Sequence, residues 1–87
     1  MITIKELAIL YAMKDYSALK NTFEELQQIK KEIDDWFTNF GLTYSNSVLM
    51  KSSYESPIRK PYNEKFDEFE IVMKTYRLCN YYLEELS

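Results

Sequence analysis

The sequence predicts an all-α protein, in which a short N-terminal helix precedes two long antiparallel helices that form a helical hairpin or bundle. Two long stretches, residues 17–40 and 61–86, carry apolar residues in alternating steps of three and four, the period of one helix face. Only one Gly and two Pro occur in 87 residues, whereas an all-β fold needs many turns. The length is that of one domain, so residues 1–87 are expected to form a single helical domain.

The first helix is predicted over residues 4–14. Thr3 and Glu6 match a capping box, in which the Thr hydroxyl and the Glu carboxylate satisfy free N–H groups of the first turn. Asp15 can end the helix because its side chain competes for backbone hydrogen bonds. No Gly or Pro stands there, so one continuous helix over residues 4–40 stays open as an alternative. The apolar residues form a broad face: Ile4, Leu7, Ala8, Leu10 and Tyr11.

The second helix is predicted over residues 17–40. Thr22 and Glu25 offer a later capping box, so the start is open by a turn or more. Gly41 is predicted to end the helix, because glycine readily takes the left-handed conformation that follows a last turn. The apolar stripe comprises Leu19, Phe23, Leu26, Ile33, Phe37 and Phe40.

Residues 41–60 are predicted to be a linker that returns the chain antiparallel. Serines and a proline interrupt any regular pattern, and a loop of this length in so small a domain is usually functional or disordered. A turn signal at residues 45–47 allows a minor β-hairpin within 42–60, and an extended loop is the alternative.

The third helix is predicted over residues 61–86. Pro61 is tolerated in its first turn, because the N–H that proline lacks would be unpaired there. The apolar stripe is wider than a narrow coiled-coil seam, which suits packing in a bundle. Asn80 interrupts it and would fix the register of an oligomer if buried, or would meet water at the edge. The expected oligomer seam comprises Phe69, Met73, Tyr76, Asn80 and Leu83.

Composition favours an interface as well as a core. Aromatic residues make up 16% of the chain, so either the core is unusually aromatic or a second chain completes it, and we expect a homo-oligomer such as a homodimer. The predicted core comprises Leu26, Ile33, Phe37, Phe69, Met73, Tyr76 and Leu83. A single cysteine excludes an internal disulfide framework. The absence of such a framework is typical of a cytoplasmic protein. No stretch of about 18 apolar residues is present, so no membrane span is expected.

Catalysis is not expected. The chain has no histidine, which removes the commonest general base and zinc ligand, and its single cysteine cannot complete a metal site. One glycine cannot build a phosphate-binding loop. We therefore predict no catalytic residue, no cofactor and no metal.

The sequence favours a small protein-binding regulator or inhibitor. Tyrosines and cations mix in the linker, a composition that is enriched in protein interfaces. The candidate partner-binding residues there are Tyr44, Lys51, Tyr54, Arg59 and Lys60. The same residues could stack on bases and hold phosphates, so a nucleic-acid-associated accessory protein is one alternative. The net charge of −3 argues against general nucleic-acid binding.

A further alternative is an acidic inhibitor. In it, the helix carrying Asp67, Glu68 and Glu70 would occupy a basic groove on a nucleic-acid enzyme. A short, acidic, helical, tyrosine-rich chain without catalytic residues is typical of many small regulators and inhibitors, including those of phages and mobile elements.

Overall fold

The protein is all-α. The computed structural model describes residues 1–39, 54–57 and 59–87. Its elements in chain order are α1 (Ile4–Ala12), α2 (Tyr16–Asn39), a single 3-10 turn η1 (Lys60–Tyr62) and α4 (Asn63–Leu86). No strand occurs among the described residues. The strands of the hairpin considered within 42–60 and the helix stop at Gly41 lie outside the described residues.

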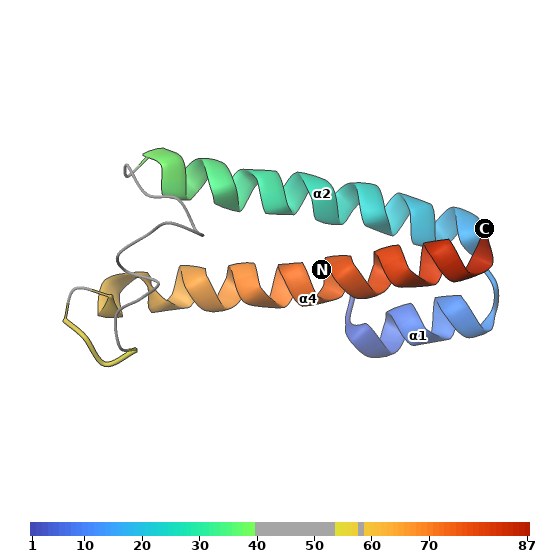
Figure 1. Cartoon of the computed structure of the whole chain (residues 1–87), viewed down its shortest axis with the longest axis horizontal. Helices are drawn as coiled ribbons and strands as arrows, with labels where there is room; N and C mark the ends of the chain where they lie inside the picture. Colours follow the sequence, from blue (N-terminus) through green and yellow to red (C-terminus); the bar gives the residue numbers. More distant parts are fainter. Residues whose placement is uncertain (40–53, 58) are drawn as a thin grey trace.

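The two long helices form an antiparallel hairpin, and α1 lies along only one half of it (Figure 1). α1 contacts both long helices and runs beside the C-terminal half of α4. The molecule is elongated, with extents of 45 × 22 × 18 Å. Three helices therefore pack together at one end of the hairpin, whereas α2 and α4 are the only described helices at the other.

A sharp break separates α1 from α2. Lys14 has a positive φ of 55°, and its N–H donates to the Tyr11 carbonyl while the Asp15 N–H donates to the Leu10 carbonyl, both at 3.0 Å. These two bonds form a Schellman motif, which usually has glycine at the left-handed position. The alternative of one continuous helix over residues 4–40 is therefore wrong. It failed because lysine here takes a conformation that the sequence gives no sign of.

Side-chain caps fix the start of both N-terminal helices. The Glu6 N–H donates to Thr3 Oγ1 at 3.1 Å, so Thr3 is the N-cap of α1, and the Thr3 hydroxyl donates to Glu6 Oε1 at 3.2 Å. The Ala18 N–H donates to Asp15 Oδ1 at 3.2 Å, so Asp15 caps α2, which begins at Tyr16. Asp15 thus ends one helix with its backbone and starts the next with its side chain.

The core has two parts. An aliphatic cluster lies at the α1 end and comprises the buried residues Leu7, Leu19, Leu26 and Cys79. An aromatic cluster lies at the other end and comprises the buried residues Ile33, Phe37, Phe66, Phe69 and Val72. Four of the seven predicted core residues are buried, and the other three, Met73, Tyr76 and Leu83, are half-buried and pack against these clusters.

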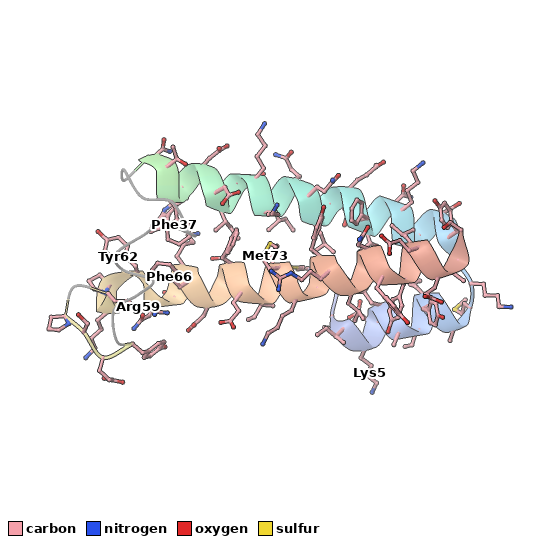
Figure 2. All side chains as sticks on the ribbon, in the orientation of Figure 1. Lys5, Phe37, Arg59, Tyr62, Phe66 and Met73 are labelled. Carbon is pink, nitrogen blue, oxygen red and sulfur yellow. The ribbon has the colours of Figure 1, made fainter. Side chains whose placement is uncertain are left out.

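Phe37 is the centre of the aromatic cluster. Its ring centroid lies 4.9 Å from that of Phe66 and 6.3 Å from that of Phe69. Trp36 and Tyr62 extend the ring packing, with Trp36 at 5.1 Å from Phe37 and 6.2 Å from Tyr62. Figure 2 shows Phe37 and Phe66 between α2 and α4, on the inner side of the hairpin.

Stacked tyrosines and a buried thiol hold the three-helix end. The Tyr11 ring of α1 stacks on Tyr82 of α4 at 4.3 Å between centroids. The Cys79 thiol donates to the Leu19 carbonyl at 3.3 Å, and burial raises its pKa. Cys79 is therefore a packed, protonated thiol that joins α4 to α2.

Candidate functional site

The described part of the predicted linker site is bound to the start of α4. Asn63 is buried, and its Nδ2 donates to the Tyr54 carbonyl at 2.7 Å while its Oδ1 accepts from Arg59 Nε at 3.0 Å. The Arg59 guanidinium carbon lies 4.9 Å from the Phe66 ring centroid and 5.8 Å from that of Tyr54 (Figure 2). These contacts anchor the segment to the hairpin. Tyr44 and Lys51 lie outside the described residues.

Two of the three predicted acidic residues are also engaged within the chain. The Tyr54 hydroxyl donates to Asp67 Oδ2 at 3.2 Å, and the charge of Asp67 raises the pKa of Tyr54. Glu68 forms an ion pair of 3.2 Å with Lys65. Glu70 is exposed, and so is Lys60 in η1.

The predicted oligomer seam faces α2 of the same chain along much of its length. Phe69 is buried in the aromatic cluster, and Tyr76 stacks on Phe23 of α2 at 4.8 Å. Met73 and Leu83 are half-buried. Asn80 is half-exposed at the edge, where its Nδ2 donates to Glu84 Oε1 at 3.3 Å. The stripe that the sequence suggested for a second chain thus packs α4 on α2.

Within residues 1–39, 54–57 and 59–87, exposed apolar side chains gather instead at α1. We define the outer face of α1 as seven exposed residues: Met1, Ile4, Lys5, Ala8, Ile9, Ala12 and Met13. The two isoleucines are each 51% exposed, and Met1 and Met13 are 61% and 68% exposed. At about 100° per residue, the positions from Ile4 to Met13 cover one half of the helix circumference. Lys5 is the one charge among them, and it points away from α4 (Figure 2).

Sequence reasoning missed this surface because it treated the apolar residues of the first helix as one buried face. In the structure Leu7 is buried and Leu10 and Tyr11 are half-buried, whereas Ile4 and Ala8 are exposed. A signal was available. The segment is apolar nearly all round, and a helix of that kind needs cover on more than one side.

The outer face belongs to a firmly held helix. α1 is capped at both ends, its own Leu7 is fully buried, and its Tyr11 stacks on Tyr82 of α4. A surface that is already ordered loses little conformational entropy on binding. The outer face of α1 is therefore the best-formed candidate interface in the described part of the chain.

Two shallow hollows offer less. One is lined by Gln27, Lys30, Lys31, Asp34 and Tyr76, and the other by Trp36, Pro61, Glu64, Lys65 and Glu68. In the second, Lys65 Nζ already lies over the Trp36 ring at 5.3 Å from its centroid. The described residues include no group of three or more metal-ligating side chains. Within the same ranges, each helix is too short or too polar to span a membrane.

Comparison with known proteins adds no relative. No protein-family model, curated protein or solved structure matches the chain. The function is therefore argued from the residues of this chain.

Proposed function

We propose that this chain is a small non-catalytic protein-binding regulator or inhibitor that acts in the cytoplasm and self-associates through its helical bundle. The outer face of α1 carries the proposal. Large apolar patches that remain exposed on a folded protein mark interaction sites. Here four large side chains are each more than half exposed: Ile4 and Ile9 in α1, and Met1 and Met13 just outside its two ends.

The chemistry of this face suits a protein surface better than a nucleic acid. A nucleic-acid site needs several cations along a backbone track, and Lys5 stands alone among apolar neighbours. The nucleic-acid alternative uses Lys51, Arg59 and Lys60, and of these Arg59 donates to Asn63 and lies over the Phe66 ring. The net charge of −3 disfavours approach to a polyanion.

A lipid surface fits less well than a protein. Interfacial helices bury an apolar face in the membrane and expose a polar face rich in Lys and Arg. The side of α1 opposite its outer face packs against α2 and α4, through Leu7 and Tyr11. Anionic lipids would also repel an acidic chain. We therefore assign the face to a second copy of this chain, which leaves the exposed charged sides of α2 and α4 for a target protein.

Sedimentation velocity across a range of protein concentrations tests the proposal. The wild-type chain should show an average mass that rises with concentration, and Ile9→Glu should be monomeric because it places a charge within the apolar interface. Asn21→Glu is the matched control, since it adds the same charge at an exposed position of α2 outside the outer face. A wild-type chain that stays monomeric up to about 1 mM would contradict self-association. So would equal effects of the two variants.

A further inference from the structure

We infer that the second copy docks antiparallel on α1, so that each Lys5 lies beside the C-terminal end of the other copy's α1. This inference rests on the self-association proposed above. It adds the direction of the partner helix and the role of the only charged residue on that face. Three features of α1 support it: the small residues of its outer face, the single charge on that face, and the absence of a basic residue from its last turn.

Small residues lie where two helices would cross. Ala8 and Ala12 are one turn apart on the outer face, with Ile4 and Ile9 on either side of them. Alanine side chains let two helix backbones approach closely, and the larger isoleucines can then fill the grooves beside them. Both alanines are exposed, so nothing in the described chain occupies that space.

The charge pattern selects the antiparallel direction. A helix C-terminus carries partial negative charge, which a nearby cation stabilises. The last turn of α1 has no basic residue, while its first turn holds Lys5 on the outer face and Glu6 off that face. An antiparallel copy crossing near Ala8 and Ile9 places Lys5 opposite the second copy's Ala12. Lys14 and Asp15 follow that end and cancel in charge.

In a parallel arrangement, Lys5 would not lie beside the negative C-terminal end of the other copy's α1. This arrangement would bring the two Lys5 residues together in an apolar contact, where like charges repel. In the antiparallel arrangement the two lysines are separated by about 10 Å along the helix axis, at 1.5 Å per residue. Each lysine can also extend its apolar stem over the other helix while its ammonium group stays in water.

The contact area predicts a weak and reversible dimer. A nine-residue helix is roughly 14 Å long, so two such helices bury less than the roughly 1,200 Å² of a standard interface. We therefore expect dissociation in the micromolar range or weaker. Such an interface lets monomer and dimer exchange within the concentration range of a cell.

Disulfide trapping between single-cysteine positions tests the direction. Ile4→Cys and Met13→Cys are prepared separately in the intact chain, where native Cys79 is fully buried and serves as the unreactive background. Under mild oxidation, the antiparallel dimer should give a covalent mixed dimer when the two variants are combined. Each variant alone should give several-fold less, as measured by mass spectrometry. Efficient cross-linking of Ile4→Cys with itself would overturn the inference in favour of a parallel pair.

Two further results separate this inference from the proposed function. In one, the wild type forms dimers in sedimentation while neither the mixture of the two cysteine variants nor either variant alone cross-links. In that case the α1 pairing is wrong while self-association stands. If the wild type is monomeric, both fail. Lys5→Gln supplies an independent readout by sedimentation: it should weaken an antiparallel dimer several-fold and tighten a parallel one. Tightening would therefore contradict the inference.

Discussion

The buried residues at the two ends of the α2–α4 hairpin are of different kinds. At the end beside α1, the buried residues are three leucines and a cysteine, drawn from three helices. At the other end, three of the five buried residues are phenylalanines, drawn from two helices. The same pair of long helices thus has an aliphatic core where a third helix covers it and an aromatic core where none of the described helices does.

Side-chain size explains the difference. A phenylalanine, tyrosine or tryptophan can bury about 150–250 Å², so a few rings can supply apolar contact that a third helix would otherwise provide. Phe37, Phe66 and Phe69 meet between the helices, and Trp36 and Tyr62 extend the contact outward. Arg59 lies over the Phe66 ring. The aromatic end is therefore stabilised by the reach of its rings.

At the aliphatic end, covering the hairpin with a third helix leaves a new apolar surface exposed on that helix. α1 buries Leu7 against the hairpin, yet its own outer face remains apolar and exposed. The aromatic surplus of the sequence is thus largely used inside one chain. Among the described residues, the largest group of exposed apolar side chains lies at α1, whereas Tyr16, Ile71 and Tyr81 are exposed on α2 and α4. The substitutions below test this difference in packing between the two ends.

The largest effect is expected from Phe37→Ala. Phe37 is fully buried and contacts three other rings, so its removal leaves a cavity that a two-helix packing cannot close. We expect the free energy of unfolding to fall by about 3–5 kcal/mol in urea titrations. Ile71→Ala, at a 55% exposed position of α4, should cost less than about 1 kcal/mol. Similar losses in both variants would contradict the aromatic cluster.

Leu7→Ala should act at the other end and act locally. The cost is expected to be roughly 2–5 kcal/mol, but α1 can detach while the hairpin stays folded. Hydrogen exchange should then show lost protection in α1 and Leu19, with amides near Phe37 and Phe69 still protected. A uniform loss of protection along the chain would show that the two ends unfold as one unit.

The helical pattern and most of the core could be predicted from the sequence. Leu26, Ile33, Phe37 and Phe69 recur at helical spacing and are buried. Periodicity identifies a face in this way because long helices pack along one stripe. It does not identify the neighbour that covers the stripe. For this reason the sequence predicts the same α4 residues both for the core and for an oligomer seam, and α2 of the same chain covers much of this stripe.

Asn63→Ala should have an intermediate effect at the aromatic end. The side chain is buried and satisfies both the Tyr54 carbonyl and Arg59 Nε, so its loss removes two hydrogen bonds that anchor the preceding segment. We expect a loss of about 1–3 kcal/mol in the free energy of unfolding. Asn80→Ala is the control, because Asn80 is half-exposed and bonds only along its own helix. Equal stabilities of the two variants would refute the anchoring role.

The candidate site could not be predicted from local pattern alone. Asn63 resembles any polar residue at a helix start, and its contacts with Tyr54 and Arg59 exist only in three dimensions. The first helix is apolar on most sides, so spacing could not show that Leu7 faces inward and Ile9 outward. That distinction depends on the turn at Lys14, which fixes how α1 folds back.

Lys14→Gly should have the smallest effect, and it should stabilise the protein. A left-handed lysine costs roughly 1–2 kcal/mol, and glycine avoids this cost. The greater conformational freedom of glycine in the unfolded chain offsets part of that gain. We expect a gain of up to about 1 kcal/mol in thermal or urea unfolding. Lys20→Gly, in the interior of α2, should instead lose about 1 kcal/mol. A loss in both variants would contradict the turn geometry.

The proposed dimer requires that the surface used by a second copy lies on α1. Amide and methyl NMR spectra recorded over a series of protein concentrations test it most directly. We predict concentration-dependent shifts confined to the outer face of α1, above all at Ile4, Ala8 and Ile9. Resonances of the aromatic cluster should stay fixed. Shifts centred on Phe69 and Met73 instead, or no shifts at all, would contradict the account.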